Sequence, residues 1–308
     1  MARATGLGRA DRATLAAFLG TVVLAGLNFV AVRFSNRELP PFEGAALRFA
    51  ASALLFFAYV RLRGIAPPTG RGLRGALLFG VLAFFGSYAL AYWGLVSAPA
   101  GLGSLAFALV PVLTAVLATT HGLELFRPRT VIGGAVASVG IAIVFGDQIS
   151  TAIPRASLLA LLAAAACAAE SGIVVKYFPR SHPAATNSVA MTTGALLLAI
   201  LSFGTGERWI LPSHALTLVA FVYLVVSTVA LFALSLFVLG RWTASATAFQ
   251  FPLAPLVTVI AAGTLAGESV SGAFLAGGVL VLGGVLLAAT GRTAARERAP
   301  SLRPAAGS

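Results

Sequence analysis

The chain has 308 residues, of which 59% are hydrophobic and only 10% are charged. A soluble domain usually carries about 25% charged residues, so this composition excludes a water-soluble globule and predicts an integral membrane protein. The formal charge of +12 does not indicate nucleic-acid binding, because the arginines lie between apolar runs and not together on one folded face.

The first apolar run, from Leu15 to Val32, follows several arginines and in this respect resembles a signal peptide. It is longer than the roughly 7–15 residues of a signal-peptide core, and it ends at Arg33 without a small-x-small cleavage site. We therefore expect an uncleaved first spanning helix.

Apolar runs of similar length follow along the rest of the chain. A spanning helix needs about 20 mostly apolar residues, and ten runs are close to this length. They predict an all-α integral membrane fold with ten transmembrane helices. The expected helices cover approximately residues 13–33, 42–61, 73–93, 98–119, 129–146, 156–177, 184–204, 213–238, 243–264 and 271–290.

The connections between these segments are short and contain proline, glycine and charge, as in RLRGIAPPTGRG. They leave no room for a separate soluble domain. In alternate connections and the termini, sixteen of the 21 basic residues fall on one side and four on the other, with Arg48 inside a segment. The positive-inside rule then places both termini in the cytoplasm, in a multi-pass protein of the inner membrane. The basic tail 291–308 is expected to be disordered.

An internal repeat is visible in the middle of each half of the chain. The stretch FALVPVLTAVLATTHGLE, residues 107–124, has a partner 144 residues further on, FPLAPLVTVIAAGTLAGE, residues 251–268. The two share a proline inside the apolar run, Pro111 and Pro255, and an acid at the end. Earlier segments match more weakly with a shift of 143 residues.

The repeat divides the chain into two five-helix halves, residues 1–149 and 150–290, followed by the tail 291–308. Since five is an odd number, the second half must cross the membrane with the opposite polarity to the first. Inverted repeats are typical of secondary transporters, in which the substrate site lies near the bilayer midplane between the halves. The symmetry therefore predicts a central cavity and transport by alternating access.

Two stretches of the first half carry a family resemblance. They are LPPFEGAALRFAASALLFF and AYWGLVSAPAGLGSLAFALVPVLTAVLATTHGLELFRPRTVIGGAVASVGIAIVF, and the layout of the second recurs in the other half. They resemble the EamA-type carriers of the drug/metabolite transporter superfamily. One departure is Leu123-Glu124 in place of the family's Gly-Glu, which Gly267-Glu268 keeps. The resemblance covers residues 13–290 and implies a ten-helix exporter of small metabolites, often amino acids, with a central cavity.

Glu170 is the acid that lies deepest in a predicted span. It is about seven residues, or roughly 10 Å, from the cytoplasmic end of its segment. Burying an acid there costs at least a few kcal/mol unless it is paired or reaches water. Glu170 is therefore a candidate to bind a substrate ammonium or to carry a coupling proton. The alternative is a scaffold role, with a hydrogen bond to a neighbouring helix or a basic partner.

Arg48 is the basic residue well inside a span, at a similar depth from the opposite end of segment 42–61. It could bind a substrate carboxylate, with Glu170 at the amine of an amino acid. Alternatively, Arg48 reaches out to the interface or pairs with Glu43. The family resemblance favours a structural or gating role, because this residue type recurs in the family whatever the substrate.

Other polar and aromatic residues in the segments are candidates for the cavity wall, with interhelical hydrogen bonding or an interfacial aromatic belt as the alternatives. Asn28, Tyr88 and Gln250 are the deeper ones. The further candidates are Ser87, Tyr92, Ser104, Asn187, Tyr223 and Thr228.

The repeated prolines and acids have separate explanations. Pro111 and Pro255 each remove a backbone donor inside a helix, which makes them candidates for a kink or hinge in the cavity wall. A purely structural kink is the alternative. Glu124 and Glu268 precede glycine-rich segments, and a carboxylate suits the free N–H groups at a helix start. We expect each acid to cap the helix that follows it.

Other functional classes fit the sequence less well. An ATP-driven pump needs G-x-x-x-x-G-K-[ST], whereas the single lysine, Lys176, follows Ile-Val-Val. An intramembrane enzyme is a remote alternative, since no H-E-x-x-H pattern occurs, and we expect no enzyme activity, cofactor or metal. A channel or a broad-specificity drug efflux carrier remains as an alternative. The expected partners are a small-molecule substrate and the lipid bilayer, without nucleic acid. The glycine pairs 133–134 and 277–278 predict close helix packing or a dimer face, and we expect a monomer or a weak homodimer.

Overall fold

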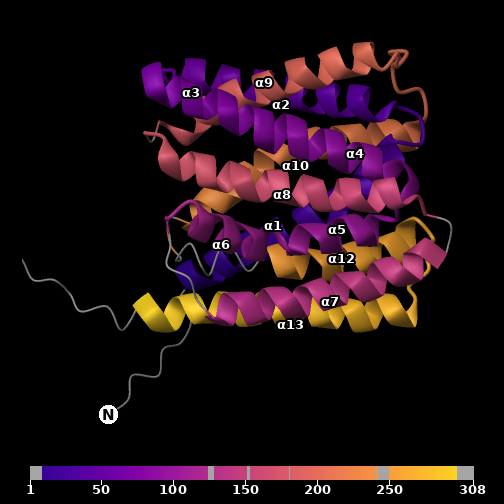
Figure 1. The fold of residues 1–308 in the computed structure, drawn as a ribbon. Coiled ribbons are helices and arrows are strands. Elements are labelled where there is room, and N and C mark those ends of the chain that lie inside the picture. The colour runs from indigo at the N-terminus through magenta and orange to yellow at the C-terminus, as the bar shows by residue number, and fades with distance from the viewer. Residues whose placement is uncertain are drawn as a thin grey trace, which may run out of the picture.

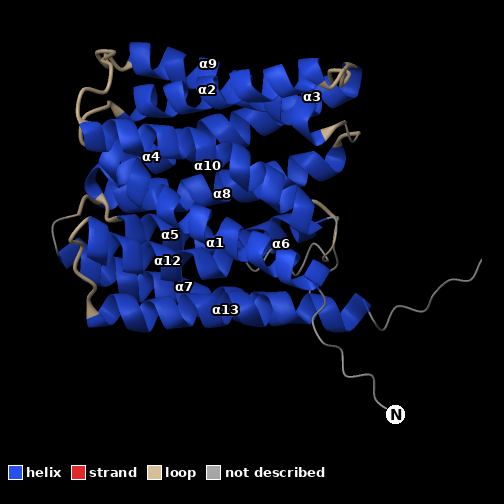
Figure 2. Cartoon of the chain, turned by 180° about the vertical axis from the view of Figure 1, so that it is seen from behind, coloured by secondary structure: helices blue, strands red, loops and turns tan. Residues whose placement is uncertain are grey.

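The computed structural model describes residues 9–123, 128–150, 153–179, 181–239, 241 and 250–296. All regular structure in these residues is helical, and the helices run side by side in one bundle (Figures 1 and 2). Seven helical spans of the described part are long and apolar enough to cross a membrane, and three further apolar helices are shorter. The predicted all-helical membrane fold is confirmed.

Each predicted segment corresponds to a helix or to consecutive helices, although residues 243–249 of the ninth lie outside the described residues. In chain order the elements are α1 (Arg9–Ser35), α2 (Pro41–Leu62), α3 (Gly70–Phe79) continuing through η1 (Gly80–Gly86) into α4 (Ser87–Ser97), α5 (Ala100–Ala108) followed by α6 (Val110–Thr120), α7 (Pro128–Ser150), α8 (Arg155–Tyr177), α9 (Pro183–Gly204), α10 (Ala215–Leu239), α12 (Gln250–Leu265) and α13 (Gly272–Arg296).

The two ends of the bundle differ in charge. The end at which α1 begins, on the left in Figure 1, holds Arg61, Arg63, Arg71 and Arg74, and we call it the basic end. The opposite end, called here the far end, holds the connections 36–40, 205–214 and 266–271.

Two glycines end helices at the far end and place an acid directly after each turn. Gly206 follows α9 with φ 75° and Gly267 follows α12 with φ 65°, a left-handed conformation that favours glycine. The next residues close the turns, because the N–H of Glu207 bonds to the carbonyl of Ser202 and the N–H of Glu268 to that of Ala262. Both carboxylates are thereby held at the rim of the bundle.

The packing of the helices has the pseudo-twofold symmetry expected of two repeats. In the first repeat α1 packs against α10 and α12 of the second, and the corresponding helix α8 packs against α4 and α6 of the first. The pairs α2–α9 and α7–α13 each join equivalent helices, and α5–α12 joins the equivalent fourth and ninth spans. Figures 1 and 2 both show α7 beside α13 at one edge of the bundle and α2 beside α9 at the other.

Glycines form the contact between α7 and α13. A Cβ added at Gly140 would lie 2.5 Å from the carbonyl oxygen of Gly277, and the same distance separates a Cβ at Gly277 from the carbonyl of Gly140. Gly133 and Gly284 face each other in the same reciprocal way. Backbones can approach this closely only without side chains. By contrast, a Cβ at Gly278 would have no atom within 4 Å, so each predicted glycine pair has one member in the helix contact.

Two spans depart from regular α-helix next to the cavity described below. The third span contains a π-helical stretch, η1. In the fourth span Leu109 separates α5 from α6, and at this residue the backbone bonds shift to the carbonyls of Ala106 and Phe107. Pro111, in the first turn of α6, lacks the N–H that would continue the helix. Its repeat partner Pro255 instead lies inside a continuous helix, α12, so only Pro111 coincides with a break.

Candidate functional site

A cavity of about 440 Å³ lies between the two repeats. Its volume is within the range of small-molecule sites, about 300–1,000 Å³. Helices of the first repeat (α1, α2, η1, α4 and α5) and of the second (α8, α9, α10 and α12) both contribute to the wall. The cavity is deeply enclosed near the far end, where Arg48, Leu95 and Ser104 are each 1% exposed. Toward the basic end Phe251 is 37% exposed.

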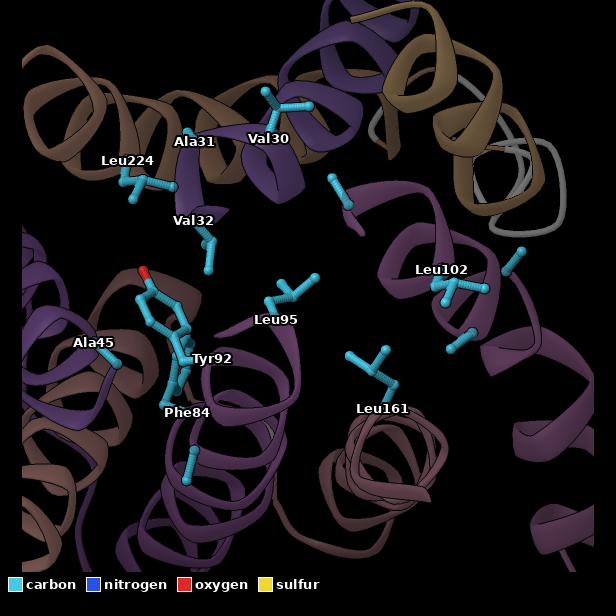
Figure 3. Close-up of a cluster of buried hydrophobic side chains, with 14 of the residues drawn as sticks. Val30, Ala31, Val32, Ala45, Phe84, Tyr92, Leu95, Leu102, Leu161 and Leu224 are labelled. Atoms are coloured by element: carbon cyan, nitrogen blue, oxygen red, sulfur yellow. The ribbon is translucent and has the colours of Figure 1, made fainter. Parts of the chain in front are cut away.

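Most of the wall is apolar and much of it is aromatic. The phenylalanines of the lining are Phe29, Phe79, Phe84, Phe107, Phe232 and Phe251. Phe29 and Phe107 meet edge to face, with ring centres 5.4 Å apart. Figure 3 shows Tyr92 and Phe84 on the same side of the span that carries both, among buried apolar side chains. The exposed surface of the cavity is therefore mainly apolar, although neutral polar side chains also line it.

Arg48 is the one charged side chain among the described residues that line the cavity. Its Nε donates to the hydroxyl of Thr228 at 3.0 Å, and its Nη2 donates to Oδ1 of Asn28 at 3.3 Å. Its Nη1 donates to the hydroxyl of Tyr92 at 3.4 Å. The guanidinium carbon lies 5.2 Å from the ring centre of Tyr88. These four partners hold the guanidinium in place on the cavity wall.

All of these partners are neutral, and no carboxylate of the described residues contacts Arg48. Glu43 does not pair with it, because Oε1 of Glu43 accepts the N–H of Ile210 at 2.8 Å. A guanidinium has five N–H donors, and the three hydrogen bonds leave one on each Nη atom. A buried charge without a counter-charge costs several kcal/mol. The geometry suits a bound carboxylate, which accepts two N–H bonds from one guanidinium.

Glu170, on α8, lies away from the cavity and contacts His121, which follows α6. Oε1 of Glu170 is 3.2 Å from Nε2 of His121, and Nδ1 of His121 is 2.8 Å from the carbonyl oxygen of Leu117. A carbonyl only accepts, so Nδ1 carries a hydrogen, and the contact with Glu170 needs a second proton on either Nε2 or the carboxyl group. One shared proton therefore joins the two repeats near the basic end.

The far end is held together by carboxylates that bind the starts of helices in the other repeat. Glu38, between α1 and α2, accepts the N–H and the hydroxyl of Ser213 at 2.6 and 2.5 Å and the N–H of His214 at 3.2 Å, just before α10. The two bonds from Ser213 hold the pKa of Glu38 well below its usual range. Glu207, between α9 and α10, accepts the N–H groups of Phe42 and Glu43, at 3.2 and 2.9 Å, in the first turn of α2.

Glu268 makes the third contact of this kind. It accepts the N–H of Ala100 at the start of α5, at 3.1 and 3.0 Å from its two oxygens, and lies 3.5 Å from Nε of Arg33. Arg33 in turn donates to the carbonyls of Leu95 and Val96 at the end of α4, both at 3.0 Å. A carboxylate at a helix start and a guanidinium at a helix end both match the helix dipole. With Glu43, which accepts the N–H of Ile210, four acids thus join the repeats across the far end.

Comparison with known proteins gives the family. The model of the EamA-like transporter family matches residues 12–146 and again residues 155–290. The chain belongs to the EamA-like transporter family. The double match agrees with the two repeats, and this EamA-like chain is a multi-pass membrane transporter.

The sequence similarity between this EamA-like transporter and its relatives extends over nearly the full length of each relative. It is 25% identical over 278 residues to a Salmonella typhimurium protein named "Probable amino-acid metabolite efflux pump", covering 86% of this chain and 91% of the relative. It is 26% identical over 275 residues to the "Uncharacterized inner membrane transporter YedA" of Escherichia coli, covering 88% and 89%. This chain also resembles a protein of known crystal structure that is 19% identical in sequence, with a TM-score of 0.65, and the match covers 94% of this chain and 99% of that protein. This likeness shows the fold alone.

The structure brings most of the predicted site residues of this EamA-like chain to one place. Glu170 and Tyr223 do not line the cavity, and the hydroxyl of Tyr223 donates to the carbonyl of Leu24 at 2.8 Å. Glu170 and Arg48 therefore do not share one site. The predicted residues on the cavity wall are Asn28, Arg48, Ser87, Tyr88, Tyr92, Ser104, Asn187, Thr228 and Gln250.

Glu268 was predicted to cap α13, the helix that follows it, and this prediction was wrong. Glu268 binds the start of α5, whereas α13 is capped by Ser271, whose hydroxyl accepts the N–H of Phe274 at 3.0 Å. The physical reason is that the left-handed turn at Gly267 directs Glu268 toward the other repeat. Glu124 lies outside the described residues.

Sequence reasoning missed the aromatic wall and the partner of Glu170. A phenylalanine in an apolar run looks the same whether it faces lipid or a cavity. One signal was available, because phenylalanine occupies equivalent positions of the two repeats, 107 and 251, and Phe107 and Phe251 both line the cavity. No sequence signal connects His121 with Glu170, since the contact depends on how α6 and α8 pack.

Proposed function

We propose that this transporter exports small metabolites that carry a carboxylate, amino acids among them, across the inner membrane by alternating access. The observation that carries this proposal is Arg48, a buried cation with neutral partners on the wall of a cavity between two repeats. The name of the Salmonella typhimurium relative, an efflux pump for amino-acid metabolites, supports the same substrate class and direction.

The orientation of the cycle follows from the charge of the two ends. By the positive-inside rule the basic end and both termini face the cytoplasm. In the arrangement described above the cavity is deeply enclosed next to the far end, where Glu38, Glu207 and Glu268 join the repeats. Release on the outside requires these contacts to open, and the repeats to close at the basic end instead.

The proton shared by Glu170 and His121 supports coupling to a proton gradient. The pair joins α8 of one repeat to the end of α6 of the other, so its protonation can favour one arrangement of the repeats. Facilitated diffusion without coupling is the alternative, in which the pair is a structural contact.

The test is transport by the purified protein in liposomes, with labelled amino acids and imposed pH gradients. A carrier gives saturable uptake that is stimulated by unlabelled substrate on the opposite side, and proton coupling makes uptake follow the pH gradient. A channel gives bulk conductance in a bilayer recording and no such stimulation. Conductance without saturable exchange contradicts the proposal. A broad-specificity drug carrier shows exchange of cationic drugs at rates equal to those of carboxylates.

A further inference from the structure

The cavity contains one positive charge and, among the described residues, no negative one. Arg48 is 1% exposed and lines the cavity, whereas every carboxylate whose side chain the structure describes is engaged elsewhere. Glu43 binds the N–H of Ile210, and Asp147 binds the hydroxyl of Ser271 at 2.6 Å. The others, Glu38, Glu170, Glu207 and Glu268, make the contacts described above.

This imbalance discriminates between substrates of different charge. A carboxylate satisfies Arg48, but the ammonium of a zwitterionic amino acid would lose its hydration without gaining a counter-charge. An isolated ammonium in a low-dielectric site is strongly unfavourable. A monoanion brings the one charge that the site lacks and nothing that remains unpaired.

The neutral groups that contact Arg48 supply no counter-charge, and several of them are already engaged. Oδ1 of Asn28 accepts from Arg48 and from the hydroxyl of Ser227 at 2.9 Å. The ring of Tyr88, which could hold an ammonium by a cation–π contact, already lies 5.2 Å from the guanidinium. The hydroxyl of Thr228 donates to the carbonyl of Leu224 at 2.7 Å and accepts from Arg48.

The repeat symmetry shows where the rest of the substrate fits. The cavity wall is built from equivalent positions, such as Asn28 and Ser171, or Phe107 and Phe251. The equivalent of Arg48, 143 residues further on, is Met191, and it also lines the cavity. Arg48 lies seven residues from the start of α2 at the far end, and Met191 lies eight residues from the start of α9 at the basic end. The site therefore has a cation at one end and, at the equivalent position toward the other end, an apolar side chain that lies among the neutral polar groups of Asn187 and Gln250.

We propose that the preferred substrate is an amphipathic monocarboxylate with an apolar or aromatic body and no charged amine, such as an N-acylated or deaminated amino acid. The carboxylate binds Arg48, and the body lies along the phenylalanines toward Met191. This inference rests on the proposed function and narrows its substrate class from carboxylates in general to net monoanions.

The test compares ligands with one aromatic body and three charges. Isothermal titration of the purified full-length protein is carried out with 3-phenylpropionate, phenylalanine and phenylalanine amide, which carry net charges of −1, 0 and +1. We expect 3-phenylpropionate to bind at least tenfold more tightly than phenylalanine, and phenylalanine amide to show no binding. Equal or tighter binding of phenylalanine overturns the inference, and this comparison needs no variant to fold.

Two variants assign the preference to the charge balance of the cavity. In Arg48→Gln the preference for 3-phenylpropionate over phenylalanine is expected to fall to within about twofold, since the cation is lost. In Gln250→Glu, which adds an acid of nearly the same shape to the wall, phenylalanine is expected to gain relative to 3-phenylpropionate. Unchanged ratios in both folded variants overturn the inference.

A flux measurement separates this inference from the proposed function. Liposomes that contain the protein are loaded with unlabelled N-acetylphenylalanine or phenylalanine and tested for exchange with the labelled compound. Saturable exchange that is faster for N-acetylphenylalanine supports both. Saturable exchange that is faster for phenylalanine contradicts the monoanion preference alone, and no exchange of either compound contradicts both.

Discussion

Glu207→Gln tests whether the far-end contacts set the balance between the two arrangements of the repeats. Glu207 belongs to the second repeat and accepts the N–H groups of Phe42 and Glu43 in the first turn of α2 at 3.2 and 2.9 Å. It also accepts the hydroxyl of Ser202 at 2.6 Å. Glutamine has nearly the same shape but lacks the charge, and it offers one acceptor oxygen instead of two.

The size of the effect follows from these contacts. Hydrogen bonds to a charged group contribute about 1.5–3 kcal/mol, and loss of a helix N-terminal cap costs about 0.5–2 kcal/mol. Because glutamine keeps one acceptor and the contacts are partly exposed, we expect the closed far end to lose about 1–2 kcal/mol. Every 1.4 kcal/mol is a factor of ten in an equilibrium constant, so the open population is expected to rise roughly 5- to 25-fold.

Thiol accessibility measures this population directly. The chain has one cysteine, Cys167, so Cys167→Ser provides a background without thiols, and Val32→Cys adds one to the cavity wall near the far end. Val32 is 4% exposed and reacts with a membrane-impermeant reagent only when the far end opens. With reagent added from the far-end side, labelling of the Glu207→Gln variant is expected to be about 5- to 25-fold faster.

Ser202→Ala is the matched control, because it removes a donor to Glu207 and an acceptor for Trp209 within the second repeat and leaves both bonds to α2 in place. Its labelling rate is expected to stay close to that of the background. If Glu207→Gln lowers the unfolding temperature but leaves the labelling rate unchanged, Glu207 stabilises the fold and does not act on opening, and the reasoning fails.

Three further predictions follow from other contacts. Gly140→Val is expected to lower the stability by at least about 1–3 kcal/mol, because its Cβ meets the carbonyl of Gly277 at 2.5 Å; Gly278→Val, with no atom within 4 Å, is the control, and equal unfolding temperatures in detergent would contradict the packing argument. Glu170→Gln removes the proton shared with His121 and is expected to weaken the stimulation of exchange by an imposed pH gradient; exchange that follows the gradient unchanged would show that the pair is a structural contact. Glu38 has a lowered pKa in the folded state, so its contribution to stability is present above its unfolded pKa of about 4.3 and is lost as the pH falls toward the folded pKa. Glu38→Gln is therefore expected to unfold at a lower temperature than the parent protein near pH 7, and this difference is expected to shrink below about pH 4. A difference that grows on acidification would refute the assignment.

The spans and the repeat could be predicted because their signals are local in the sequence. A run of about 20 apolar residues specifies a spanning helix by itself, and the matching prolines Pro111 and Pro255 reveal the duplication without any knowledge of packing. Arg48 could be singled out as a candidate for a similar reason, since a charge deep in a span needs an explanation wherever it lies, and the structure places it on the cavity wall.

The partners of the charged residues could not be predicted, because they depend on tertiary contacts between distant segments. Glu268 was expected to bind the helix that follows it, but it accepts the N–H of Ala100 at the start of α5, 168 residues away in the sequence. For Glu170 the sequence left a substrate or proton role and a scaffold contact open, and helix packing places it against His121. Even the repeat does not decide such details, since Pro111 coincides with a helix break and Pro255 does not.

The far-end contacts and the substrate site are linked through one helix. Glu207 binds the first turn of α2, and Arg48 lies on the same helix seven residues after its start, or roughly 10 Å away. Opening of the far end that breaks the bonds of Glu207 therefore releases the helix that carries Arg48, the residue proposed to bind the substrate carboxylate. Because Arg48 lies toward the far end and Met191 toward the basic end, a monocarboxylate that enters from the basic end reaches Arg48 with its charged group first. It can leave through the far end in the same orientation, without turning in the cavity.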